Sequence, residues 1–344
     1  MSTPTGSRDM VRGASGIRRA LHGSAHFGGA VLLLLSLLGF HHLIDWPAPV
    51  SVLVLAAAAV AWWRFRRGLW MPAAALIMLL AAFTWLSQLE PSNRRDWPAE
   101  TSVLPGIEVE GSRVTIRGFR NFRWREDGGY EPRWDTRVLD LNDLRELALV
   151  VVPFNTSELM AHTMLSFGFG SSNRVVVSVE ARKERQEKYG LIPGALRQFE
   201  LVYILGDERD LLTVRALVRG ARLYVYPVRA EPDFIHNLFL DMASAANGLR
   251  HRPRFYRSLR DNCTTTLVKH VNRRIDRPIG LRVEALFPAL MGRLLHELGY
   301  MRTDLPYDQA RSRFRADDRV RRHATDPDFS RLIRLDQPTR GHGH

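Results

Sequence analysis

Cysteine is almost absent from this sequence of 344 residues, since Cys263 is the only one. A single thiol excludes an intramolecular disulfide framework and any zinc or iron–sulfur site built from several cysteines. The glycine-rich stretch Gly168-Phe169-Gly170 has no Lys-Ser/Thr after it, so it does not match a phosphate-binding loop. No metal-ligand cluster or nucleotide motif is visible, and we therefore expect neither a metal nor a cofactor.

Lysine is also scarce, although the chain is strongly basic. Its 49 basic residues include only three lysines and exceed the 36 acidic residues by 13. Nine bases and five acids precede residue 105, so residues 105–344 keep 40 bases and 31 acids, a net charge of +9. We expect such a surface to meet anionic lipid or envelope polymers rather than nucleic acid.

Long apolar runs are confined to the first 90 residues. Phe27–Ile44, Trp46–Phe65 and Leu69–Leu89 each come near the ~20 residues that cross a bilayer as a helix. We therefore expect three membrane-spanning helices over residues 27–89. Two spans and a re-entrant segment are the alternative, because the apolar core of the second run is short. A cleaved signal peptide would explain only the first run.

Arginines flank these runs unevenly. Four precede the first run and three, Arg64, Arg66 and Arg67, follow the second, while the loop between the two runs holds only Asp45. The positive-inside rule then places the N-terminus, residues 1–26, in the cytoplasm and the chain after the third run on the opposite side. We expect a bacterial inner-membrane protein with a linker at 90–104, a periplasmic domain at 105–334 and a tail at 335–344.

Alternating apolar and polar residues predict strands throughout the soluble region. One hairpin is expected within 107–124, around Gly111-Ser112, and a second over Ala161–Phe169 and Arg174–Arg182. Further strands are expected at 139–154, 199–205 and 222–228. Helices are expected at 208–219, 233–249, 263–273 and 286–298, and a solvated tail from Thr325. The predicted class is α+β, a mostly antiparallel sheet with helices packed against it.

The candidate chemistry concentrates around Cys263, which opens the predicted helix at 263–273. An Asp or Asn just before a helix caps it, and Asp261 and Asn262 stand there. A helix N-terminus stabilises a thiolate, and its free N–H groups can donate to a developing oxyanion. Cys263 is thus a candidate nucleophile, with Asn262 and Thr264 as supporting residues. An inert buried cysteine is the alternative.

A cysteine nucleophile needs an imidazole, and His162 is the favoured candidate. His270 lies seven residues along the cysteine helix, about 10 Å away at 1.5 Å per residue, too far for a hydrogen bond to the sulfur. His162 lies on the polar face of its strand, which we expect to pair with the face that carries Ser178 and Glu180. Glu180 is the predicted orienting carboxylate of a Cys–His–acid triad, and Ser178 is the alternative.

Several ordered motifs together resemble a known family. They are Ala161–Phe169, Ser178–Glu184 with Tyr189, Asp207–Asp210, the pair Phe255-Tyr256, and Asn262–Thr265. In these motifs, from about Ile107 to Arg334, the chain is similar to the family of the periplasmic domain of the lipoprotein N-acyltransferase Lnb (DUF4105). The resemblance implies a circularly permuted papain-like, NlpC-type fold in which histidine precedes cysteine. It also implies catalytic roles for Cys263 and His162, with Glu180 as the third residue.

Three classes of function stay open. On the resemblance, Cys263 takes a fatty-acyl chain from a phospholipid as a thioester and passes it to an amine, such as the N-terminal cysteine of a lipoprotein. The same groups would serve an amidase or peptidase that cuts cell-wall peptides, with water as the acceptor. The third class is an envelope scaffold that uses the fold only for binding. We expect the acyltransferase, with the bilayer and a phospholipid or lipoprotein as partners.

Overall fold

The structure is a computed structural model that describes residues 80, 83–154, 157, 159–258, 260–275, 278–279 and 287–334. The chain divides into two compact units. The first unit comprises residues up to Glu90 and Gly190–Gln198, and its described part includes the short helix α5 (Leu191–Ala195). The second unit comprises Pro91–Tyr189 and the chain from Phe199 onward, and it holds every candidate site residue named above.

The predicted membrane spans lie outside the described residues, apart from residues 80 and 83–89. The N-terminal segment 1–26 and the tail 335–344 lie outside them as well. A search of the described residues finds no helix whose length and apolar character would suit a membrane crossing.

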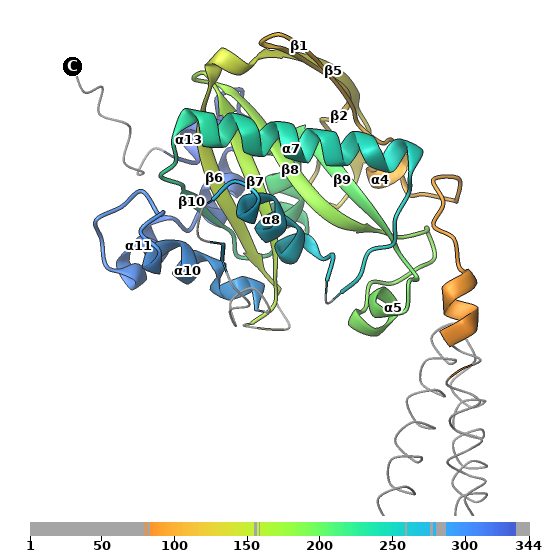
Figure 1. Cartoon of the computed structure of the whole chain (residues 1–344). Coiled ribbons are helices and arrows are strands. Elements are labelled where there is room, and N and C mark those ends of the chain that lie inside the picture. Colours follow the sequence, from red (N-terminus) through yellow and green to blue (C-terminus); the bar gives the residue numbers. More distant parts are fainter. Residues whose placement is uncertain are drawn as a thin grey trace, which may run out of the picture. The chain divides into compact units, whose positions relative to one another are not determined.

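A sheet forms the centre of the second unit (Figure 1). In the described part of the chain it has eight strands, in the order β1-β2-β9-β8-β7-β6-β10, with β5 paired to β2 beside this path. Its pairings are antiparallel except for one short parallel contact between β2 and β9. The strands of this sheet are β1 (Gly106–Glu110), β2 (Arg113–Arg120), β5 (Trp134–Asp140), β6 (Leu144–Pro153), β7 (Ala161–Phe169), β8 (Asn173–Arg182), β9 (Glu200–Asp207) and β10 (Tyr224–Pro227). A separate ribbon pairs β3 (Arg123–Trp124) with β4 (Tyr130–Glu131).

Both predicted hairpins are confirmed. β7 and β8 turn at Gly170, whose φ of 66° lies in the left-handed region that glycine adopts without strain. The β7–β8 register pairs Met164 with Ser178 and Leu165 with Val177. Because side chains alternate along a strand, this register puts His162, Ser178 and Glu180 on one face of the sheet, as predicted.

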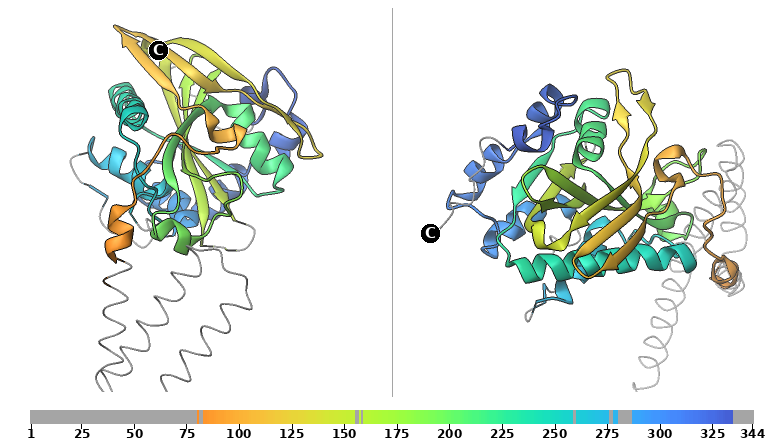
Figure 2. Two further views of the ribbon diagram at one scale, coloured as in Figure 1. Left: turned by 90° about the vertical axis from the view of Figure 1, so that its right-hand side faces the viewer. Right: turned by 90° about the horizontal axis from the view of Figure 1, so that it is seen from above.

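Helices cover both faces of the sheet (Figures 1 and 2). One face carries α7 (Pro232–His251) and α8 (Cys263–Asn272), and the opposite face carries α6 (Glu208–Thr213), the π-helical turn η2 (Val214–Val218), α12 (Asp317–Arg322) and α13 (Phe329–Leu332). The remaining described helices of this unit are α4 (Ala99–Ser102), η1 (Leu141–Asp143), η3 (Pro288–Leu290), α10 (Met291–Glu297) and α11 (Tyr307–Arg313). The observed class is therefore the predicted α+β class, although α11 and α12 were not foreseen.

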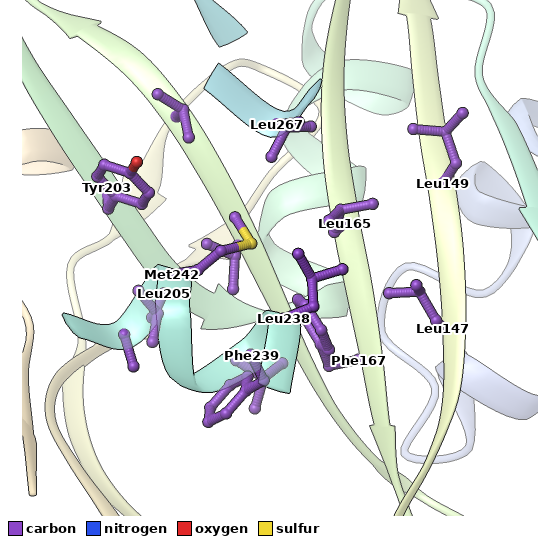
Figure 3. Packing of buried hydrophobic residues seen from close by; sticks show 14 of the residues in the cluster. Leu147, Leu149, Leu165, Phe167, Tyr203, Leu205, Leu238, Phe239, Met242 and Leu267 are labelled. Carbon is purple, nitrogen blue, oxygen red and sulfur yellow. The ribbon is translucent and has the colours of Figure 1, made fainter. Parts of the chain in front are cut away.

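Each face of the sheet has its own hydrophobic core. Under α7, the side chains of Leu238, Phe239 and Met242 pack on Leu165 and Phe167 of β7 (Figure 3). Truncating one such fully buried side chain to alanine costs about 2–5 kcal/mol of stability. The opposite core lies under α6, so β7 and β8 are covered on both sides. This double cover explains why the expected polar face of β7 is itself buried.

The expected linker at 90–104 packs against the domain, and Ser92 and Asn93 already bond to it. Trp97 is buried, and the guanidinium of Arg182 lies 4.2 Å from the centre of its ring. The Arg182 guanidinium also donates to the backbone carbonyl oxygens of Thr101 and Ser102. One tryptophan and the short helix α4 therefore anchor the end of this otherwise polar segment to the domain.

The solvated tail expected from Thr325 is also corrected. Phe329 and Ile333 are buried in the core under α6. Next to them, Arg334 forms an ion pair with the fully buried Glu208. Two apolar side chains and one buried ion pair therefore hold the segment 329–334 against the domain, although its polar sequence predicted an exposed tail.

Candidate active site

The N-terminus of α8 is built by a reciprocal cap. The Asn262 side chain accepts a hydrogen bond from the backbone N–H of Thr265 at 2.8 Å, and the Thr265 hydroxyl accepts one from the backbone N–H of Asn262 at 3.1 Å. This capping box satisfies two N–H groups near the start of the helix. Cys263 is the first helical residue, so the predicted cap, Asn262, holds the thiol at the helix N-terminus.

The thiol lies against the beginning of β7. Its Sγ is 3.9 Å from the carbonyl oxygen of Ala161 and 3.8 Å from the Thr264 hydroxyl, and Cys263 is 7% exposed. The Thr264 hydroxyl in turn hydrogen-bonds the Thr163 hydroxyl at 3.0 Å. Thr264 thus ties the cysteine helix to the strand that carries His162.

An apolar cavity of about 430 Å³ opens beside these threonines. Thr163 and Thr264 line it together with apolar side chains of β6, β7, α7, α8 and α10, including Leu149, Leu267 and Leu294. Along α8, the lining residues Thr264, Leu267, Val268 and Val271 recur at helical spacing. The cavity therefore follows one side of α8 away from the thiol.

His162 belongs to a hydrogen-bonded chain on the other face of β7. Its Nε2 is 2.7 Å from the Ser178 hydroxyl, which donates to Glu180 Oε1 at 2.8 Å. Because the single proton of Ser178 goes to Glu180, the hydroxyl accepts from an Nε2–H of His162. This arrangement assigns the tautomer and leaves Nδ1 of His162 as the nitrogen with a free lone pair.

Arg215, which the sequence analysis did not single out, completes this chain. It is almost fully buried in the π-helical turn η2, and its guanidinium donates to Glu180 Oε1 at 2.7 Å. The direct separation of His162 Nε2 from Glu180 is 3.8 Å, so Ser178 mediates between imidazole and carboxylate. The only sequence signal for Arg215 is a basic residue within the otherwise apolar stretch Leu211–Val218.

Burial and Arg215 set the charge states of this chain. Burial, and then repulsion from Arg215, lower the pKa of His162 to about 3, although Glu180 partly opposes this shift. Burial would raise the pKa of Glu180, but attraction to Arg215 and then to His162 outweighs it and lowers that pKa. Burial lowers the pKa of Arg215 to about 10, which still leaves it charged at neutral pH. His162 is thus neutral and Glu180 ionised.

Thr264 and the His162 group lie on opposite faces of β7. Thr264 contacts Thr163 on one face, whereas His162, Ser178 and Glu180 share the other. The Cys263 thiol lies beside the first residue of the strand, 3.9 Å from the Ala161 carbonyl oxygen. A hydrogen bond between the Cys263 thiol and the imidazole is not among those of the described residues. The β7–β8 ladder ends at Met164–Ser178, while β8 stays paired with β9 as far as Arg182, so the two strands separate beside His162.

Tyr256 is a buried tyrosine whose side chain contacts Tyr189. Burial raises the pKa of its buried phenol, and the charges of Cys263 and, more weakly, Glu180 raise it further. Its hydroxyl is also 3.4 Å from that of Tyr189. The sequence pointed to Tyr256 only through its place in the family motif.

His270, the histidine on α8, lies in a different environment from His162 on β7. His270 Nδ1 is 2.7 Å from Asp241, and its Nε2 is 2.7 Å from the Tyr203 hydroxyl. Both ring nitrogens are thus occupied, in agreement with its exclusion as the partner of Cys263. Within the described ranges, no group of three or more His, Cys, Asp or Glu side chains is placed to hold a metal ion.

Comparison with known proteins gives one match. Residues 130–297 match the family model described as the Lnb N-terminal periplasmic domain. No curated protein matches the chain, and no solved structure does. The matched segment contains His162, Glu180 and Cys263, and it is narrower than the likeness expected from Ile107 to Arg334. This match supports an Lnb-like domain within residues 130–297.

Proposed function

We propose that this Lnb-like domain is a cysteine acyltransferase of the cell envelope. Cys263 takes a fatty-acyl chain from a lipid ester and passes it to an amine of a lipid or lipoprotein. The proposal includes the permuted papain-like arrangement, in which the histidine strand β7 precedes the cysteine helix α8. It also includes an inner-membrane anchor at 27–89 that keeps the domain near its lipid substrate.

The apolar cavity beside the thiol carries this proposal. A cavity whose walls are mostly leucine, valine, isoleucine and phenylalanine side chains favours a hydrocarbon chain, because each buried CH₂ contributes about 0.8 kcal/mol. Cell-wall peptides are polar and would leave their amides without partners in such a cavity. The cavity therefore supports acyl transfer over the amidase alternative.

The proposed first step forms the thioester. His162 Nδ1 accepts the thiol proton, and the thiolate attacks the ester carbonyl. The ester C–O bond then breaks, and the leaving alcohol takes the proton from the imidazolium. The backbone N–H groups of Cys263 and Thr264, which the cap does not use, supply donors for the oxyanion.

The second step releases the acyl chain. An amine attacks the thioester carbonyl, the C–S bond breaks, and the amine proton passes to His162. The ionised Glu180 acts through Ser178 to hold the imidazole in the tautomer with the lone pair on Nδ1. For direct transfer, Nδ1 must approach Cys263 through the opening between β7 and β8 when substrate binds.

The test follows the covalent intermediate by intact mass. The full chain in neutral detergent is mixed with diacyl phospholipid and quenched in acid. We expect an added fatty-acyl mass that neutral hydroxylamine removes from the wild type, a more stable ester on Cys263→Ser, and no adduct on Cys263→Ala. Val271→Phe, which fills the cavity about 10 Å along α8 from Thr264, should favour shorter acyl chains.

An exposed valine offers a matched control for the cavity variant. Val109→Phe changes the same residue type on β1, where the side chain is 45% exposed, and should not alter chain-length preference. Failure to form any lipid adduct, together with release of amines from peptidoglycan peptides, would replace the acyltransferase by the amidase.

A further inference from the structure

A second cavity, of about 290 Å³, lies on the same face of the sheet as the apolar one. Its walls come from β10 and the end of β6, together with η3, α10 and α11. Polar side chains dominate these walls, namely Arg222, Arg293, Arg311, Tyr224, Tyr226 and Tyr307. We call this space the arginine cavity. Its lining differs in kind from that of the apolar cavity.

The charge of the arginine cavity is unbalanced. Its three arginines face a single acidic lining residue, Asp308. Among the described residues, none of the three arginines forms an ion pair with a carboxylate. Arg293 and Arg311 are exposed and Arg222 is half-buried, so water screens their mutual repulsion, and an anion that enters the concave space is attracted by all three. The cavity is therefore suited to an anionic ligand.

Aromatic rings hold two of these arginines in place. The Arg311 guanidinium lies 5.3 Å from the centre of the Tyr224 ring, and that of Arg293 lies 5.2 Å from the centre of the Tyr307 ring. Stacking on a ring fixes the guanidinium plane and leaves its N–H edge available for a planar or tetrahedral oxyanion. Such preorganised forks bind phosphate in a bidentate manner.

The tyrosines give the arginine cavity uncharged hydroxyl groups that can donate hydrogen bonds, and their rings form part of its wall. Burial raises the pKa values of Tyr226 and Tyr307, so both phenols keep their protons at neutral pH. Tyr226 packs so closely against Gly292 that a Cβ there would lie 2.6 Å from the ring. This contact fixes α10 against β10 and keeps the cavity wall in position.

Helix α10 separates the arginine cavity from the apolar cavity. Met291 and Leu294 line the apolar side, whereas Arg293 lines the polar side. The arginine cavity also reaches Pro153, which pairs across β6–β7 with Ala161, whose carbonyl is 3.9 Å from the Cys263 Sγ. A molecule with an anionic end and an apolar chain joined by a short linker could occupy both cavities and place its linker near the thiol.

We propose that the arginine cavity binds the phosphate of a glycerophospholipid, the acyl donor of the proposed reaction. The donor role rests on the proposed function, but the phosphate binding does not. In this arrangement the headgroup phosphate lies among Arg222, Arg293 and Arg311 while an acyl chain enters the apolar cavity. The glycerol esters between them then lie beside Cys263.

The test measures binding by calorimetry. The full chain carries Cys263→Ala to prevent turnover and is kept in neutral detergent. The probes are dihexanoyl phosphatidylglycerol, dihexanoylglycerol, which lacks the phosphate, and inorganic phosphate. We expect the phospholipid to bind at least about tenfold more tightly than dihexanoylglycerol. Arg293→Gln and Arg311→Gln should each weaken phospholipid binding about five- to tenfold and leave dihexanoylglycerol binding unchanged.

Arg313→Gln provides the matched control. Arg313 is exposed on the same helix, α11, but does not line the cavity, so its variant should change the phospholipid Kd less than about twofold. An equal loss of phospholipid affinity with Arg313→Gln would mean that general surface charge causes the binding, and it would contradict a specific site in the arginine cavity. Equal affinity for both dihexanoyl probes would do the same. Inorganic phosphate that binds as tightly as phospholipid would make this a site for free phosphate.

The two proposals fail separately. Arginine-dependent phospholipid binding without any acyl adduct on the wild-type thiol would contradict the transferase and leave the phosphate site standing. An acyl adduct that forms equally well in the Arg293→Gln and Arg311→Gln variants, with unchanged phospholipid affinity, would contradict the phosphate site alone.

Discussion

The two faces of β7 are both buried, yet they differ in the groups that pack against them. On the face toward α8, Thr163 and Thr264 border a cavity that has almost only apolar walls. On the face toward η2, the His162, Ser178, Glu180 and Arg215 side chains form a continuous hydrogen-bonded chain. One face borders an apolar cavity, and the other holds fixed charges.

This difference matches two requirements of the proposed thiol enzyme. A buried charge is stable only when it is paired and hydrogen-bonded, and the Glu180–Arg215 pair meets that condition away from the apolar cavity. An acyl chain needs a dry apolar space, which charged groups would disrupt. In the proposed reaction, the imidazole reaches the thiol at the point beside His162 where β7 and β8 separate.

Of the changes that test this contrast between the two faces, removing the His162 imidazole should have the largest effect. We expect His162→Ala to lower the rate of acyl-enzyme formation by about 10²–10⁴, the usual contribution of general acid–base catalysis. Alkylation of Cys263 by iodoacetamide near pH 7 should slow as well, because the thiol loses its base. Mass spectrometry of samples quenched at successive times measures both rates.

His270→Ala is the control for this variant. His270 is also a buried histidine, but it bonds Asp241 and Tyr203 rather than the Ser178 chain. The His270→Ala variant should be less stable, but Cys263 in its folded form should be alkylated at the wild-type rate. An alkylation pH profile that is the same in wild type and His162→Ala would show that the imidazole does not act on the thiol.

Removing the charge of Glu180 tests the charged face by itself. Glu180→Gln leaves the nearly buried Arg215 without its carboxylate, which we expect to cost about 3 kcal/mol of unfolding free energy. The double variant Glu180→Gln/Arg215→Met should recover most of that loss, because no unpaired charge then remains. Thermal unfolding of the full chain measures both. A loss below about 1 kcal/mol in the single variant would mean that water already screens Arg215.

The sequence predicted much of this arrangement because strand alternation is a local signal. The hairpin of β7 and β8 and the shared face of His162 and Glu180 follow from a period of two residues and one turn. The cap at Asn262 likewise depends on residues adjacent in the chain. These features needed no knowledge of tertiary packing.

The parts that the sequence missed depend on distant contacts. Arg215 reaches Glu180 across 35 positions, and no local pattern marks a buried arginine as the partner of a particular carboxylate. Nor does alternation reveal that helices cover both faces of β7, or that Thr264 contacts the face opposite His162. Both cavities arise from spacing between elements, which leaves no periodic trace in the sequence.

The smallest expected effect concerns pH and the neutral His162. Its pKa is about 3 in the folded protein and near 6.5 when unfolded, so the unfolded chain binds a proton first as the pH falls. His162 is therefore fully compatible with the folded state above pH 6.5, and stability declines below it by up to about 1.4 kcal/mol per pH unit. The depressed pKa of Glu180 acts only below about pH 4.5, outside this window.

Comparing wild type with His162→Gln isolates that contribution. Asp207, whose pKa burial raises to about 6, opposes the trend, but it is present in both proteins and cancels in their difference. Urea unfolding followed by tryptophan fluorescence should show wild type losing roughly 2 kcal/mol more than His162→Gln between pH 7.5 and pH 5. A stability difference that stays constant over this range would mean that His162 can take up a proton in the folded state. The charged face would then resemble a solvated site, and its contrast with the apolar face would be lost.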